Sequence, residues 1–330
     1  MKRFITTALS ILSALTVATA ADKAAPREFK FEGNPLVRDI YTADPTAKVF
    51  NGRLYVYTSH DRPDADYFFM TDWRVFSTDD MVNWTDHGTL FSLDDIPWAK
   101  DMAWAPDCIE RNGNYYFYYP VERTKIGVAV SKSPVGGFKD SGKALVDNTG
   151  QVDHIGPEPI DPTTIVHKGQ AYIYFGCRHF RWAKLKDNMI ELDGEIKEMK
   201  IIGNENDKQN HGGFYGEAPF IFKRKGTFYM LYSNGWGRSS RMVYATSKSP
   251  EGPFTYQGNV LGGVSSGTTH GSMVEFKGQW YIFYHNMELS GKNHRRSVAF
   301  DKIYFNKDGS INEAVQTFGV PRWVAPEKKK

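Results

Sequence analysis

The sequence predicts an all-β protein whose one large domain is a five-bladed β-propeller. The main observation is a repeat, Gly-x-x-Tyr followed closely by another aromatic residue, which occurs five times in 330 residues. The repeat glycines are Gly52, Gly113, Gly169, Gly226 and Gly278, at intervals of 61, 56, 57 and 52 residues. Long helical periodicity is absent, and Gly, Pro, Asn and Asp interrupt the chain at short intervals. Evenly spaced β units indicate a repeat architecture.

Each repeat unit is predicted to begin with two strands joined by a tight turn. The stretches "TAKVFNGRLYVY" (46–57) and "TTIVHKGQAYIY" (163–174) show the pattern, a β-rich run on either side of a residue pair that ends in glycine. A unit of about four strands cannot bury both of its faces alone, so five such units are expected to surround a common axis. A β-sandwich is the structural alternative, but it gives no reason for five repeats. We expect the propeller to span residues 34–323.

The two ends of the chain are expected to lie outside this domain. Residues 1–20 read as a signal peptide, with Lys2 and Arg3 before an apolar stretch and "ATA" (18–20) as the cleavage site. Residues 21–33 are then a linker and 324–330 a basic tail. The leader predicts export to the periplasm or the extracellular space. No later stretch is long and apolar enough for membrane insertion.

The charge balance argues against partners that bind by bulk electrostatics. Of 41 Lys and Arg residues two lie in the leader, which leaves 39 against 38 Asp and Glu. A near-neutral chain has no broad attraction for nucleic acid or anionic membranes. The two cysteines, Cys108 and Cys177, could pair after export or remain buried free thiols, and the sequence leaves both alternatives open. A monomer is favoured.

Acidic residues recur at one position of the repeat. Eight residues before each turn glycine the chain has Asp44, Ala105, Asp161, Ala218 and His270, and Glu217 precedes Ala218. Equivalent positions of successive blades surround one axis, so these side chains should gather at one mouth of the central channel. Asp before Pro is also a common turn device. That reading does not explain why two Asp residues, a Glu and a His share one register.

Paired carboxylates in a cleft suit the hydrolysis of glycosidic bonds. One acid protonates the leaving oxygen while the other activates water or attacks the sugar. A third carboxylate nearby can raise the pKa of the acid and keep it protonated near neutral pH.

Residues 34–323 resemble glycoside hydrolase family 43, whose members are five-bladed propellers that trim arabinose- and xylose-containing polysaccharides. The resemblance rests on stretches that occur in order, one for each blade. They are "YTADPTAKVFNGRLYVYTSHD", "MAWAPDCIERNGNYYFYYPV", "IDPTTIVHKGQAYIYFG", "GEAPFIFKRKGTFYMLYS" and "HGSMVEFKGQWYIFYHN".

The resemblance implies roles for three carboxylates. It makes Asp44 the general base, Glu217 the general acid, and Asp161 the residue that tunes the pKa of the acid and orients it. Family members invert the anomeric configuration, so Asp44 and Glu217 should lie roughly 6.5–9.5 Å apart to admit a water molecule.

The resemblance also implies a set of substrate-binding residues. Trp104 would line the first sugar subsite and Arg296 would reach the sugar, although the sequence does not say whether Arg295 or Arg296 points inward. His270 would lie in the channel, where a Ca²⁺ or Na⁺ ion is a further expectation, bound by His270 through water. His285 and His294 are expected in loop or core. No cofactor is expected for the chemistry.

The expected function is that of an exo-acting, inverting glycoside hydrolase that removes terminal pentoses, with α-L-arabinofuranose preferred. A β-D-xylosidase or a dual xylosidase/arabinofuranosidase is the alternative. A carbohydrate-binding propeller without catalytic activity is the other functional class, but it would not need three carboxylates. A retaining fructan-processing propeller is disfavoured because its "NDPNG" and "RDP" motifs are missing.

Overall fold

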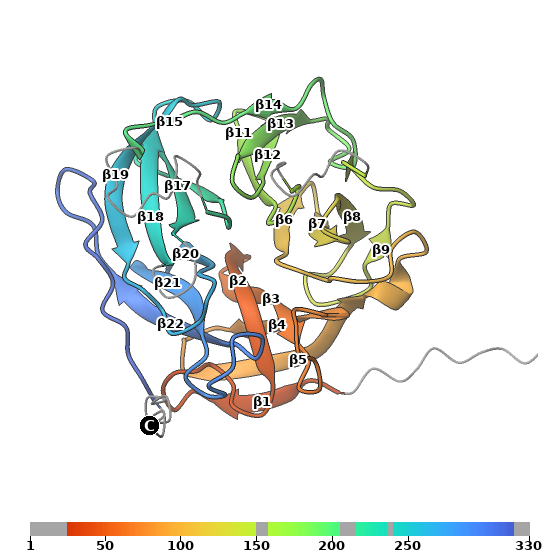
Figure 1. Cartoon of the computed structure of the whole chain (residues 1–330), viewed down its shortest axis with the longest axis vertical. Helices are drawn as coiled ribbons and strands as arrows, with labels where there is room; N and C mark the ends of the chain where they lie inside the picture. Colours follow the sequence, from red (N-terminus) through yellow and green to blue (C-terminus); the bar gives the residue numbers. More distant parts are fainter. Residues whose placement is uncertain (1–24, 150–157, 205–215, 236–239, 320–330) are drawn as a thin grey trace, which may run out of the picture.

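The computed structural model describes residues 25–149, 158–204, 216–235 and 240–319, and their regular structure is almost entirely β. Five sheets surround a central axis, which confirms the predicted five-bladed propeller (Figure 1). The one helix among these residues is the short 3₁₀ turn η1 (Leu93–Asp95). Within the described ranges, no helix has the length and apolar character needed to cross a membrane.

The first two blades are five-stranded sheets. Blade 1 contains β1 (Arg27–Lys30), β2 (Tyr41–Phe50), β3 (Arg53–Asp61), β4 (Asp72–Thr78) and β5 (Asn83–Ser92), in the spatial order β1-β5-β4-β3-β2. Blade 2 contains β6 (Asp107–Arg111), β7 (Asn114–Val121), β8 (Lys125–Ser131), β9 (Lys139–Asp140) and β10 (Val146–Asp147). Its order is β10-β8-β7-β6, and β9 also pairs with β8.

The last three blades vary at their outer edges. Blade 3 contains β11 (Thr163–His167), β12 (Gln170–Phe175), β13 (Arg181–Leu185) and β14 (Lys197–Glu198). Blade 4 contains β15 (Ile201–Ile202), β16 (Phe220–Arg224), β17 (Thr227–Asn234), β18 (Arg241–Ser247) and β19 (Phe254–Leu261), with β15 parallel to β19. Blade 5 contains β20 (Gly271–Phe276), β21 (Gln279–Asn286) and β22 (Ser297–Ile303).

The five repeat glycines lie in equivalent two-residue hairpin turns, as the sequence predicts. In blade 1, Phe50 pairs with Arg53 across the turn Asn51–Gly52. Both turn residues have positive φ, 50° for Asn51 and 80° for Gly52, and the other four hairpins repeat this pair of values closely. Positive φ at both positions is the type I′ turn, whose twist matches that of the flanking strands.

The hydrophobic core is divided among the blade interfaces. Each of five clusters of buried apolar side chains lies between two neighbouring blades, and one of them contains Trp73 and Phe91 of blade 1 with Phe117 of blade 2. The Trp73 and Phe117 rings meet edge to face with centroids 5.6 Å apart. Aromatic side chains therefore supply much of the packing between blades, where edge-to-face contacts between rings are favourable.

The innermost strands of neighbouring blades belong to different sheets, so side chains rather than paired backbones join them. Thr46 Oγ1 of blade 1 donates to the Pro106 carbonyl at 2.8 Å, and the Thr164 amide of blade 3 donates to Asp107 Oδ2 of blade 2 at 2.7 Å. Lys48 Nζ lies 2.8 Å from Asp107 Oδ1. These contacts fix the blades around the channel, and so fix the residues at its mouth.

The segment before β2 meets blade 5 where the ring closes. The Leu36 amide donates to the Val298 carbonyl at 2.7 Å, so this segment lies along the edge strand β22. The predicted linker 21–33 needs a correction, because Arg27–Lys30 form β1 and pair with β5. This pairing depends on a partner more than 50 residues away, which a four-residue segment does not reveal. Residues 1–24 and 320–330, with the predicted leader and tail, lie outside the described residues.

Candidate active site

The residues predicted at the channel mouth do come together there, on the starts of the innermost strands. Asp44 lies in β2, Asp161 and Ala218 come just before β11 and β16, and His270 comes just before β20. Asp44, Asp161 and Ala218 have φ values of 52°, 56° and 62°. Each also precedes a proline, which restricts the residue before it to extended conformations. A positive φ at these non-glycine residues therefore strains the backbone. Blades 1, 3 and 4 therefore share one local backbone conformation at the start of the innermost strand.

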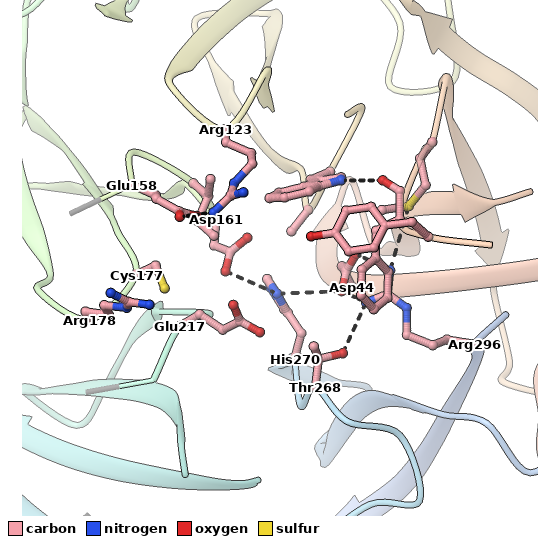
Figure 2. A pocket seen from close by; sticks show the side chains of 16 residues that line it. Asp44, Arg123, Glu158, Asp161, Cys177, Arg178, Glu217, Thr268, His270 and Arg296 are labelled. Carbon is pink, nitrogen blue, oxygen red and sulfur yellow. Dashed lines mark hydrogen bonds and ion pairs between the residues drawn. The ribbon is translucent and has the colours of Figure 1, made fainter. Parts of the chain in front are cut away.

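The pocket has a volume of about 230 Å³. Its lining comes from all five blades and consists of Asp44, Tyr67, Phe68, Met70, Trp104, Ala105, Arg123, Glu158, Ile160, Asp161, Cys177, Arg178, Glu217, Thr268, His270 and Arg296. All six residues that the sequence singles out as catalytic or substrate-binding are among them. Figure 2 shows Asp161 and Glu217 on one side of His270 and Asp44 with Arg296 on the other.

Asp44 is held as a carboxylate by a cluster of donors. Arg296 Nη1 and Nη2 donate to its two oxygens at 2.8 and 3.2 Å, and Ser59 Oγ donates to Oδ2. Burial alone raises the pKa of Asp44, but the Arg296 guanidinium and the neighbouring His285 hold it well below its ordinary value. Asp44 is therefore ionised at neutral pH.

Arg296, rather than Arg295, points inward. Its guanidinium also bonds Asp61, with Nε and Nη2 donating at 2.9 Å each, and lies 4.8 Å from the centroid of the Phe68 ring. The two carboxylates of Asp44 and Asp61 take up most of its five donors. Arg296 lines the pocket, but its close contacts identify it first as the counter-ion of Asp44.

The pKa values of Asp161 and Glu217 are shifted upward, opposite to that of Asp44. Burial raises the pKa of Glu217 to about 7, and the negative charge of Asp44 adds to this. Burial and the Glu217 charge likewise raise the pKa of Asp161, whose Oδ2 accepts the Ala218 amide at 2.8 Å. Two neighbouring buried carboxyls resist double ionisation, so the pair retains a proton near neutral pH. Within the described part of the chain, the Glu217 carboxyl makes no hydrogen bond.

His270 lies between the two sides of the pocket. Its Nδ1 is 3.9 Å from Asp44 Oδ1 and 3.9 Å from Asp161 Oδ2. Burial lowers the pKa of His270 to about 4, so the imidazole is neutral at neutral pH. Among the described residues no group of three or more His, Cys, Asp or Glu side chains is arranged to hold a metal ion. The Ca²⁺ or Na⁺ ion expected near His270, bound through water, stays a prediction.

Aromatic and apolar side chains form one wall of the pocket. Trp104 is partly buried, and its Nε1 donates to the Phe68 carbonyl at 2.8 Å while its own carbonyl accepts Trp73 Nε1 at 2.6 Å. The Nε1 bond fixes the indole beside the pocket, and its contact with a sugar stays a prediction. Cys177 also lines the pocket. It and Cys108 are both buried and free.

Two residues that support Asp44 are missed by the sequence reasoning. His285, expected in loop or core, lies in β21 with its Nδ1 3.1 Å from the Asp44 amide nitrogen and its Nε2 3.1 Å from the Thr268 carbonyl. Asp61 ends β3 and is 1% exposed. The available signal is similar for both: a polar or charged residue in the last two positions of a strand whose middle is aromatic, "RLYVYTSHD" and "QWYIFYHN".

Comparison with known proteins agrees with this geometry. The family model for glycosyl hydrolases family 43 matches residues 33–311. The chain is 37% identical to xylosidase/arabinosidase 43A of Humicola insolens, covering 84% of this chain and 98% of that protein. It is 32% identical to a beta-xylosidase of Xylanibacter ruminicola, with coverages of 82% and 96%.

A solved structure extends the likeness to three dimensions. The beta-xylosidase/alpha-arabinofuranosidase CoXyl43 from a compost microbial metagenome, crystallised with xylotriose in a calcium-free form, superposes with a TM-score of 0.76. It is 34% identical in sequence, and the match covers 88% of this chain and 98% of that one. With the propeller, the carboxylate pocket and these matches established, the chain belongs to glycosyl hydrolase family 43 and is an exo-acting glycoside hydrolase that needs no cofactor for catalysis.

Proposed function

We propose that the enzyme removes terminal β-D-xylopyranosyl and α-L-arabinofuranosyl residues from xylan-derived oligosaccharides, with inversion of configuration. The observation that carries the proposal is the pocket in which an ionised Asp44 and a proton-bearing Glu217 lie on either side of a neutral His270. The names of relatives and structural neighbours, which combine xylosidase with arabinosidase or arabinofuranosidase activity, support the two sugars. The stronger preference for arabinose expected from the sequence stays a prediction.

In this proposal each carboxyl has one task. Asp44 accepts a proton from a water molecule as that water attacks the anomeric carbon. Glu217 donates its proton to the glycosidic oxygen as the bond to the leaving sugar breaks. Asp161 holds the Ala218 amide next to Glu217 and resists its ionisation by like-charge repulsion. Trp104 lines the sugar subsite, and Arg296 orients Asp44 and keeps it charged.

The test is proton NMR of the purified protein with aryl α-L-arabinofuranoside and aryl β-D-xyloside. We expect the first-formed pentose to have inverted configuration with both substrates, and the ratio of the two initial rates gives the preference. A retained configuration would overturn the role of Asp44 in water activation. Release of neither pentose would contradict the proposed substrates. An aryl β-D-galactofuranoside is then the next substrate, because a relative from Aspergillus niger is a beta-D-galactofuranosidase.

We also propose that the enzyme is exported and acts as a monomer. The support for export is the sequence of residues 1–20. Cell fractionation with N-terminal sequencing tests the cleavage after Ala20, and light scattering on the purified protein tests the monomer.

A further inference from the structure

We propose that the ion pair between Arg123 and Glu158 at the pocket mouth binds the sugar on the leaving-group side, by hydrogen bonding to two adjacent hydroxyl groups. This inference rests on the proposed function, because it assigns a leaving sugar to the glycosidic bond that Glu217 protonates. It makes the ion pair a determinant of substrate specificity rather than part of the catalytic machinery.

The pair joins two blades at the edge of the pocket. Arg123 lies in the turn between β7 and β8 of blade 2, where its backbone has a φ of 60°, and Glu158 precedes the first strand of blade 3. Arg123 Nη2 donates to Glu158 Oε1. The Glu158 carbonyl accepts the amides of Ile160 and Cys177 at 3.0 and 3.2 Å, which fixes its backbone. The side chains are 44% and 15% exposed, so the pair faces solvent at the rim.

The side of the pocket on which the pair lies identifies its ligand. In an inverting reaction the acid protonates the leaving oxygen on one face of the sugar while water attacks from the other. Figure 2 shows Arg123 and Glu158 on the side of Asp161 and Glu217, away from Asp44. Glu158 is also close enough for its charge to help raise the pKa of Glu217. A sugar leaving from Glu217 toward solvent passes this pair.

The unused polar atoms of the pair match the chemistry of a sugar diol. Among the described residues, the Arg123–Glu158 bond is the one hydrogen bond formed by either side chain, so further N–H donors of Arg123 and Oε2 of Glu158 remain for a ligand. Each sugar hydroxyl both donates and accepts, so two neighbouring hydroxyls can bond a guanidinium and a carboxylate together. The leaving group favoured here is a pyranose with a free vicinal diol, such as the 4-linked xylose of a xylan fragment.

The experiment compares two substrates that differ only in the leaving group. The leaving group of xylobiose is xylose, which carries the diol. The leaving group of β-D-xylosyl fluoride is fluoride, which makes no such contact. We expect Arg123→Met and Glu158→Gln each to lower kcat/KM on xylobiose about tenfold more than on the fluoride. This factor corresponds to the loss of one charge-assisted hydrogen bond, and it should appear chiefly as a higher KM. Arg62→Met is the matched control, because Arg62 is 42% exposed and paired with Asp64 outside the pocket lining.

Fluoride turnover reports the base and the sugar subsite, and the xylobiose rates are measured well below pH 7, where Glu217 keeps its proton in every variant. A selective loss on xylobiose then reports the leaving-group contacts. Equal losses on the two substrates, or a loss of the same size in Arg62→Met, would overturn the inference. Fluoride release without cleavage of xylobiose by the unaltered enzyme would also overturn it while leaving the hydrolase chemistry in place. Absence of fluoride release from the unaltered enzyme would instead overturn the proposed function, and the inference with it.

Discussion

At the scale of single residues, this pocket gives two buried aspartates opposite protonation behaviour. Asp44 and Asp161 occupy the same position in blades 1 and 3, with the same left-handed backbone before proline. Arg296 donates two hydrogen bonds to Asp44 and holds its pKa down. Asp161 has Glu217 as its neighbour instead, and burial next to a like charge raises its pKa. The environment, not the residue type, decides which of the two aspartates is ionised.

Replacement of the base should abolish turnover. In the proposed mechanism Asp44 accepts the proton of water, so we expect Asp44→Asn to lower kcat by about 10³-fold or more on every substrate. The measurement is steady-state kinetics on aryl β-D-xyloside, with Asp64→Asn, an exposed aspartate, as the control. A loss of less than tenfold would remove Asp44 from the role of base.

The raised pKa of Glu217 predicts the shape of the pH profile. The acid must carry its proton, so kcat/KM should fall as pH rises through about 7. Because the pKa of Asp44 is lowered well below its ordinary value, Asp44 should contribute no ascending limb near neutral pH. Glu217→Gln should remove the basic limb and reduce activity on xylobiose far more than on aryl glycosides, whose leaving groups need no proton. The exposed Glu275→Gln is the control. A basic limb unchanged in Glu217→Gln would assign it to another group.

At the scale of secondary-structure elements, strand β21 of blade 5 positions the base in blade 1. The Asp44 amide donates to His285 Nδ1 at 3.1 Å, while His285 Nε2 lies 3.1 Å from the Thr268 carbonyl. His285 is fully buried. These contacts satisfy a backbone amide in a strained conformation that would otherwise be buried without a partner. His285 is a positioning residue, because it acts through Asp44.

Substitution of His285 tests this role. His285→Phe leaves the Asp44 amide without an acceptor, and we expect kcat to fall about tenfold with a smaller change in KM. His285→Gln offers an amide oxygen near the same place and should restore part of the rate. If the two variants lose stability and rate in parallel, with no rescue by Gln, the role of His285 is packing alone.

At the scale of the whole molecule, a short N-terminal segment closes the ring. Asn34 Nδ2 donates to the Phe300 carbonyl at 3.0 Å, and its Oδ1 accepts the Phe300 amide at 3.0 Å. The Leu36 amide bonds Val298 in the same strand. This segment lies along β22, the edge strand of the three-stranded blade 5, and it joins the first blade to the last. The active site uses residues of both blades, so closure also preserves the pocket.

The closure can be tested at one side chain. Asn34→Ala leaves two buried backbone groups of β22 without partners, and we expect the free energy of unfolding to drop by about 2–4 kcal/mol. Denaturant unfolding measures this, with Asn306→Ala, whose amide bonds Ser310 at the surface, as the control. A drop no larger than that of the control would show that packing between blades closes the ring without Asn34.

The sequence by itself determined the repeat, the number of blades and the carboxylates and histidine that share the pocket. Five Gly-x-x-Tyr turns at a nearly constant interval predict five blades, because each turn needs the same positive φ values at its two residues. Equivalent positions then share one axis, so the repeat register alone places Asp44, Asp161, Glu217 and His270 at one pocket. These features depend on turn conformation and on the spacing of the repeat, and both can be recognised from the order of residue types.

The tertiary structure alone decided which charge faces which. That Arg296 is committed to Asp44 and Asp61, that His285 holds the Asp44 amide, and that β1 joins blade 1 all depend on contacts between residues far apart in the chain. The same holds for Arg123 and Glu158, which meet at the rim only because blades 2 and 3 are neighbours. The pKa values of buried groups depend on distances to charges in other blades, and sequence spacing does not encode those distances.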